Sequence, residues 1–181
     1  MQSLPDKAPS CSPWVEKHLH LIGRDQPVLD LAAGSGRHTR LLLERGYENI
    51  TAADIDTTAL SDLAERPGVS IVEHDLEKAP WPFAPASFAG IIVTNYLWRP
   101  RFSSIIATLS PGGVLIYETF MQGQERLGRP RNPDFLLQPG ELRQRLEPFC
   151  DILAFREGAD PGPPPAMRQG VVARRRSEKA G

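Results

Sequence analysis

Short apolar runs alternate with amphipathic segments along most of this chain. Runs of about four to eight mainly apolar residues, bounded by turn-forming residues, are typical of buried strands. They predict strands at residues 27–31, 49–53, 69–73, 90–95, 113–119, 151–156 and 169–174. The intervening segments predict helices at about 13–22, 36–45, 102–109 and 139–146, and one that begins at Asp56 and ends before Pro67.

This alternation of strands and helices predicts an α/β fold. The expected architecture is a doubly wound, Rossmann-like sheet of seven strands, mostly parallel, with helices on both faces. The last connection departs from that pattern, because residues 157–165 contain four prolines and two glycines and cannot supply a crossover helix. The last strand is therefore expected to be antiparallel. We predict one domain over residues 1–181, with a helical cap at 1–26, a core at 27–175 and a tail at 176–181.

Composition narrows the class of protein further. The 181 residues carry a net charge of −1, which gives no general electrostatic reason to expect nucleic acid or membrane binding. The longest apolar run is four residues, whereas a membrane span needs about 20. The N-terminus lacks the apolar region of a signal peptide, and two cysteines favour a reducing, cytoplasmic setting. The 18 prolines lie mostly between the predicted elements.

The most informative segment is VLDLAAGSGRH, at residues 28–38. A predicted strand ends there, Gly34 and Gly36 allow a tight turn, and a helix begins. Small residues let a ligand approach the backbone closely, and the helix N-terminus favours a polar or anionic group. A dinucleotide-binding turn would have a third glycine where Thr39 stands. The alternative interpretation of this segment is a simple tight turn that binds no ligand.

Three aspartates lie at the ends of predicted strands. Asp30, Asp54 and Asp75 close the first, second and third strands, so they are expected at one edge of a parallel sheet. An ionised carboxylate only accepts hydrogen bonds, so its partners would be an ammonium group, ribose hydroxyls or an adenine amine. A capping or turn role is the alternative for each carboxylate, and above all for Asp56.

Five stretches in this order resemble the class I S-adenosylmethionine-dependent methyltransferases: VLDLAAGSGRHT, ITAADID, VEHDLE, GIIVTNYLWRP and LSPGGVLIYETF. The resemblance covers about residues 27–175 and implies S-adenosylmethionine as cofactor. It implies that Asp30 and the 32–36 turn lie under the methionine moiety, that Asp54 holds the ribose, and that Asn95 lies by the sulfonium. The implied cofactor-binding residues are Asp30, Ala32, Gly34, Gly36, Arg37, Asp54, Ile55, Asp75, Leu76 and Asn95.

Within that set, the resemblance implies that Ile55 packs on the adenine, while Asp75 and Leu76 read its edge. Ala32 departs from the family, which has glycine at this position, and Ala89 replaces a residue that is often acidic. The chain also looks like a small bacterial subgroup near the tellurite-resistance methyltransferases.

Residues that could bind a methyl acceptor lie at the ends of the fourth and fifth predicted strands. The candidate catalytic residues are Asn95, Tyr96 and Glu118. Tyr96 and Trp98 could wall an aromatic pocket, and Arg99 could hold an anion. Equally, Trp98 could cap the core and Arg99 could be solvated. Glu118 is the best single polar candidate, although a salt bridge explains it as well.

Residues 120–135 form a long, basic connection that could act as a lid over an acidic acceptor or be a solvated loop. The histidine spacing favours no metal. We expect a methyltransferase acting on a small molecule, because the core uses nearly the whole chain. The alternatives are methylation of RNA or protein, suggested by the basic loop and the tail at 174–179, and a non-catalytic cofactor-binding module. A nucleic-acid partner is disfavoured.

Overall fold

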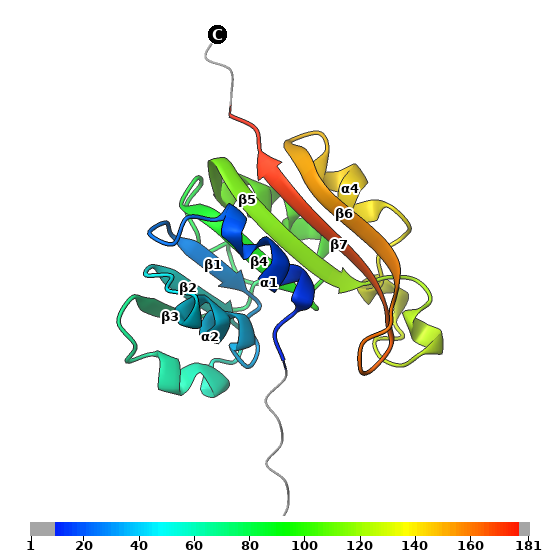
Figure 1. The fold of residues 1–181 in the computed structure, drawn as a ribbon, viewed down its shortest axis with the longest axis horizontal. Helices are drawn as coiled ribbons and strands as arrows, with labels where there is room; N and C mark the ends of the chain where they lie inside the picture. Colours follow the sequence, from blue (N-terminus) through cyan, green and yellow to red (C-terminus); the bar gives the residue numbers. More distant parts are fainter. Residues whose placement is uncertain (1–9, 178–181) are drawn as a thin grey trace, which may run out of the picture.

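A seven-stranded sheet forms the centre of the computed structural model, which describes residues 10–177 (Figure 1). All the predicted strands are confirmed, and they lie in the order β3-β2-β1-β4-β5-β7-β6. Their bounds are β1 Val28–Leu31, β2 Ile50–Asp54, β3 Val69–Glu73, β4 Phe88–Thr94, β5 Leu109–Phe120, β6 Cys150–Asp160 and β7 Ala166–Arg175. The expectations for the first residues, including the lack of a signal peptide, and for Lys179 lie outside the described residues.

The predicted change of strand direction is confirmed at one edge of the sheet. Strands β1 to β5 pair in parallel, whereas β7 is antiparallel to both β5 and β6. The connection between β6 and β7 is shorter than expected, because pairing continues to Asp160 and Ala166. Gly158 continues the strand at a φ of 116°, which other residues rarely adopt. Only the proline-rich residues 161–165 remain as the hairpin turn.

Four α-helices cover the sheet in the described part of the chain: α1 Pro13–His18, α2 Arg37–Glu44, α3 Phe102–Thr108 and α4 Glu141–Leu146. The helix predicted from Asp56 is instead a 3₁₀-helix at Thr58–Leu63. Leu60 and Leu63 are both buried, and their spacing of three matches the three residues per turn of a 3₁₀-helix. Shorter 3₁₀-helices occur at Leu19–Leu21, Arg99–Arg101, Gln124–Arg126 and Pro133–Phe135. None of the described helices is long and apolar enough to cross a membrane.

The sheet buries a separate apolar cluster on each face. One cluster joins Leu41 and Leu42 of α2 and Val15 of α1 to the strands, and Figure 1 shows these two helices in front of the sheet. The other cluster joins Phe102 of α3 and Leu142 of α4 to the opposite face. This two-sided burial confirms the predicted doubly wound arrangement.

The segment before β1, which contains Leu19 and Ile22, packs directly on the central strands. The hydroxyl of Tyr47 donates to the carbonyls of Leu19 and Ile22, at 2.6 and 3.1 Å. Ile22 then packs on Gly90 of β4, where a Cβ atom would lie only 2.6 Å from the Ile22 Cδ1. Gly90 is therefore required by this close approach.

We expect Gly90→Ala to lower the free energy of unfolding by about 1–3 kcal/mol, because the added methyl group overpacks this contact. In an Ile22→Ala background the same substitution should cost less, by at least about 0.5 kcal/mol, because the colliding atoms are gone. Urea unfolding of the four proteins measures both costs. An equal cost in the two backgrounds would show that Ile22 does not exclude a side chain at this position.

Candidate functional site

The turn after β1 has an unusual backbone. Ala32, Gly34 and Gly36 all have positive φ, at 56°, 55° and 74°. Gly36 precedes α2, and a Cβ atom there would lie 2.6 Å from the Leu60 Cδ2. Ala32 adopts a conformation that costs an L-residue about 1–2 kcal/mol. The predicted tight turn is therefore present, and it is strained where the resembled family has glycine.

Asp30 lies buried beneath this turn. Its side chain is 1% exposed, and its Oδ2 accepts a 2.7 Å hydrogen bond from the Thr39 hydroxyl. Burial raises the pKa of Asp30 to about 6, although the Thr39 hydrogen bond opposes this change. The carboxylate is thus ionised at neutral pH at some energetic cost.

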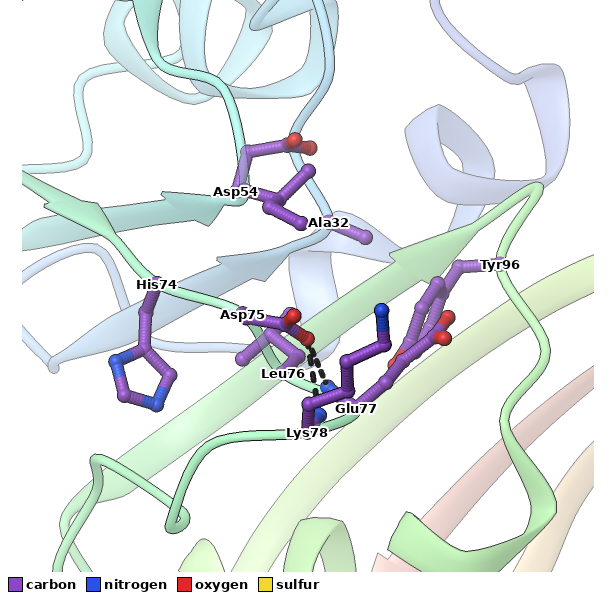
Figure 2. Close-up of a pocket in the computed structure, with 9 residues that line it drawn as sticks. Ala32, Asp54, His74, Asp75, Leu76, Glu77, Lys78 and Tyr96 are labelled. Atoms are coloured by element: carbon purple, nitrogen blue, oxygen red, sulfur yellow. Dashed lines mark hydrogen bonds between the residues drawn. The ribbon is translucent and has the colours of Figure 1, made fainter.

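A cavity of about 280 Å³ opens beside the turn, at the carboxyl ends of β1, β2 and β3. Its lining residues are Ala32, Asp54, Ile55, His74, Asp75, Leu76, Glu77, Lys78 and Tyr96. Figure 2 shows Ala32 and Asp54 facing Asp75 and Lys78 across it, with Tyr96 at one end. Ile55 is 64% exposed, so this apolar side chain is available to cover a ligand.

Two carboxylates of this cavity keep acceptor capacity. Asp54 Oδ2 accepts from the Gly34 N–H at 2.8 Å, which ties the turn to the end of β2. Asp75 Oδ1 accepts from the Lys78 and Glu77 N–H groups, both at 2.9 Å, and these backbone hydrogen bonds lower the pKa of Asp75. The turn role considered for Asp75 is therefore real, but it uses only one carboxylate oxygen.

A second cavity, of about 290 Å³, adjoins the first. Its lining residues are Glu77, Asn95, Tyr96, Leu97, Thr119, Phe120, Pro130 and Phe135. Glu77 and Tyr96 line both cavities. Asn95 and Tyr96 are thus brought together as expected, and the 120–135 connection contributes part of the wall. The sequence pattern does not indicate Glu77 or Thr119 as site residues; the only signal is that each is next to a residue or stretch named above.

Tyr96 separates the two cavities. The Tyr117 hydroxyl donates to the Tyr96 carbonyl at 2.7 Å, which holds the backbone at this point. The Tyr96 hydroxyl is buried and has no hydrogen-bond partner within residues 10–177. Burial raises the pKa of Tyr96, so the hydroxyl is neutral and able to donate at physiological pH.

Arg37 and His38, at the start of α2, bind the segment that precedes α1. Arg37 donates to the Ser10 carbonyl at 3.0 Å and to the Thr94 hydroxyl at 3.4 Å. His38 Nε2 accepts from the Ser12 N–H at 3.1 Å. Burial lowers the pKa of His38 to about 3, so the ring is neutral, as an acceptor must be. Arg37 lies beside the turn but lines neither cavity.

Glu118 and Arg99 also lie away from both cavities. Glu118 accepts from the Ser12 hydroxyl at 2.6 Å and is ion-paired with Arg156. Strand side chains alternate between faces, so Glu118 shares a face with α1 while Thr119 reaches the second cavity. The Arg99 guanidinium is bound to both Glu141 carboxylate oxygens at 2.8 and 2.9 Å. Neither side chain is free to hold a ligand in this arrangement.

No group of three or more His, Cys, Asp or Glu side chains that could hold a metal occurs among the described residues. The site therefore consists of a strained turn, acidic strand ends and two adjoining cavities. The site lies where the strand order reverses, between β1 and β4. This is the usual position of ligands in open α/β sheets.

Comparison with known proteins finds a methyltransferase domain and a shared fold. A family model described as a methyltransferase domain matches residues 28–113, whereas no curated protein sequence matches the chain. Among solved structures, the chain is similar to 1,6-didemethyltoxoflavin-N1-methyltransferase from Burkholderia thailandensis, determined with its substrate and S-adenosylhomocysteine bound. The identity is 22% over 91% of this chain and 76% of that one, with a TM-score of 0.67.

Two further solved structures share the fold. An S-adenosylmethionine-dependent methyltransferase from Mesorhizobium loti has 18% identity over 90% of this chain and 96% of that one, with a TM-score of 0.71. TehB from Haemophilus influenzae has 18% identity over 95% of this chain and 64% of that one, with a TM-score of 0.73. The domain match over residues 28–113 and the shared fold both agree with the resemblance to S-adenosylmethionine-dependent methyltransferases.

We expect Asp30→Asn to raise the free energy of unfolding at pH 7.5. The pKa of Asp30 is about 6 in the folded state against an ordinary 3.8, so the folded protein binds this proton more tightly and loses stability as pH rises through 6. The benefit of the amide should grow from near zero at pH 4 to about 3 kcal/mol above pH 6. Urea unfolding across this range measures it, with the exposed Asp25→Asn as control, and a pH-independent difference would contradict the assignment.

Glu118→Ala should lower the free energy of unfolding by about 3 kcal/mol, because it leaves Arg156 without its buried partner. Asp160 still pairs with Arg156 at 3.0 Å, which limits the loss. Glu118→Gln should cost less, because it keeps an acceptor for Ser12. Calorimetric titration should give an unchanged affinity for S-adenosylhomocysteine in both folded variants, and a loss of affinity without destabilisation would return Glu118 to the site.

Proposed function

We propose that this chain transfers a methyl group from S-adenosylmethionine to a small molecule, and that the two adjoining cavities hold the cofactor and the acceptor. The observation that carries this proposal is their shared wall. Tyr96 and Glu77 line both cavities, so ligands in the two would lie side by side. This is the arrangement that direct transfer between two bound molecules needs.

The residues of the first cavity suit an adenosine group. Asp54 offers carboxylate oxygens to ribose hydroxyls, and the exposed Ile55 side chain offers an apolar surface to the base. Asp75 keeps one oxygen for an exocyclic amine. The Leu76 N–H makes no hydrogen bond within residues 10–177, so it can donate to a ring nitrogen. These assignments follow the resemblance and fit the donors and acceptors that are present.

The methionine end would extend along the turn after β1. Gly34 and Gly36 carry no side chain and Ala32 carries only a methyl group, so a ligand could approach the backbone of this turn closely. Asp30 lies beneath the turn, where its negative charge favours an ammonium group. Arg37 lies beside it and offers a cation for a carboxylate. We thus assign Asp30, Ala32, Gly34, Gly36 and Arg37 to the methionine end, as the resemblance implies.

When bound, the cofactor supplies a methyl group on a positively charged sulfur. The chain's own residues need mainly to align the acceptor and exclude water, since transfer is an in-line displacement. Asn95 lines the second cavity next to Tyr96 and is the side chain best placed to orient an acceptor. A general base is required only if the acceptor must lose a proton before transfer.

A small acceptor is favoured by the second cavity, which measures about 290 Å³ and is partly covered by Pro130 and Phe135. The similar protein from Burkholderia thailandensis acts on 1,6-didemethyltoxoflavin. The tail arginines give little support to an RNA acceptor. Arg175 donates to the Ala107 and Leu109 carbonyls, and Arg176 donates to Asp151 and to the Cys150 carbonyl.

Isothermal calorimetry should detect binding of S-adenosylhomocysteine to the purified protein. Asp54→Ala should weaken this binding by about tenfold or more, because ribose hydrogen bonds to a charged acceptor are lost. Asp25→Ala, which removes an exposed carboxylate away from both cavities, should leave it unchanged. No binding by the wild type would contradict the proposed cofactor, and an unchanged affinity of a folded Asp54→Ala variant would remove Asp54 from the site.

A further inference from the structure

Arg168 of β7 contacts two residues that form the wall of the second cavity. The register of the antiparallel pair sets Arg168 opposite Phe120 of β5. Its guanidinium carbon lies 4.2 Å from the centre of the Phe120 ring. Its Nη1 donates a 2.7 Å hydrogen bond to Asn95 Oδ1. Both partners, Phe120 and Asn95, line the cavity.

The charge of Arg168 is incompletely balanced by its neighbours. Its Nε is 4.0 Å from Asp160 Oδ2, beyond hydrogen-bond distance. That carboxylate is bound at 3.0 Å by Arg156, which also pairs with Glu118. The Arg168 side chain is only 18% exposed, so water compensates little of its charge.

Neighbouring arginines add to this excess of positive charge. Arg37 and Arg156 are close enough to act on Arg168 electrostatically, and Glu118 and Asp160 are the carboxylates that oppose them. Counting Arg168 itself, three guanidinium groups and two carboxylates therefore contribute to the local charge. An anion at this position would gain charge-assisted hydrogen bonds from an arginine that is already partly desolvated.

We propose that Arg168 is a specificity-determining residue that selects a methyl acceptor carrying a carboxylate or similar anionic group. This inference rests on the proposed function of the second cavity. The apolar part of the acceptor would pack against Leu97, Phe120 and Phe135, and the anionic group would reach Arg168 beside Asn95. The hydrogen bond to Asn95 also makes Arg168 a positioning residue for that amide.

The test uses the full chain saturated with S-adenosylhomocysteine. The probes are benzoate, cinnamate and nicotinate, each compared with its uncharged amide by ligand-observed NMR and calorimetry. Wild-type protein should bind at least one acid about tenfold more tightly than its amide, as expected for a hydrogen bond to a charged group. Arg168→Gln should abolish this preference, whereas Arg168→Lys should keep part of it because the charge remains.

Arg143→Gln is the matched control. It removes the same charge from a side chain of α4 that is 56% exposed and lines neither cavity, and it should leave the acid-over-amide preference intact. A merely structural role of Arg168 would weaken acids and amides equally, so the ratio of the two affinities is the deciding readout. Thermal unfolding of each variant checks that the fold is retained.

The proposal is overturned if wild-type protein binds acids no better than amides, if no acid binds at millimolar concentration, or if Arg168→Gln keeps the preference. It is also overturned if Arg168→Gln weakens S-adenosylhomocysteine as strongly as the acids, because Arg168 would then serve the cofactor carboxylate. Normal S-adenosylhomocysteine binding without an acid preference would contradict only this inference. Failure of the wild type to bind S-adenosylhomocysteine would contradict the proposed function as well.

Discussion

The hydrogen bond from the Gly34 N–H to the Asp54 carboxylate, 2.8 Å long, joins the ends of β1 and β2 and holds the site together. It fixes a turn whose backbone would otherwise be unfavourable, since Ala32 has a φ of 56°. It also holds Asp54 at the rim of the first cavity. A strained backbone persists only where the surroundings determine it strongly, and here the hydrogen bond from Gly34 to Asp54 is one of the contacts that do so.

The same turn connects the site to the core. Gly36 precedes α2 and packs against Leu60 so closely that an added Cβ would lie 2.6 Å from the Leu60 Cδ2. Asp30 is buried below it and bonded to Thr39 of α2. A charged carboxylate in this position costs stability at neutral pH. The role proposed above, toward the ammonium group of the cofactor, would offset part of this cost.

The two cavities depend on contacts between distant parts of the chain. Phe120 ends β5 and Phe135 lies in the connection after it, while Tyr96 follows β4. Arg168 reaches this region only because β7 inserts between β5 and β6 in antiparallel register. The strand reversal therefore does more than complete the sheet, because it brings a partly buried cation beside a cavity that the parallel strands form.

The sequence by itself determined the strands, the order of the elements, the tight turn and the acidic ends of β1, β2 and β3. These features are local: glycine spacing, apolar runs and proline positions act over a few residues. Only the tertiary structure decided that Thr119 rather than Glu118 faces the second cavity. Strand β5 is buried on both faces, so its sequence lacks the alternation of polar and apolar residues that would reveal which face each side chain occupies. Only the structure showed that Glu141 occupies Arg99 and that Arg168 is incompletely paired, because charge pairing across the sheet depends on register and not on neighbours in sequence.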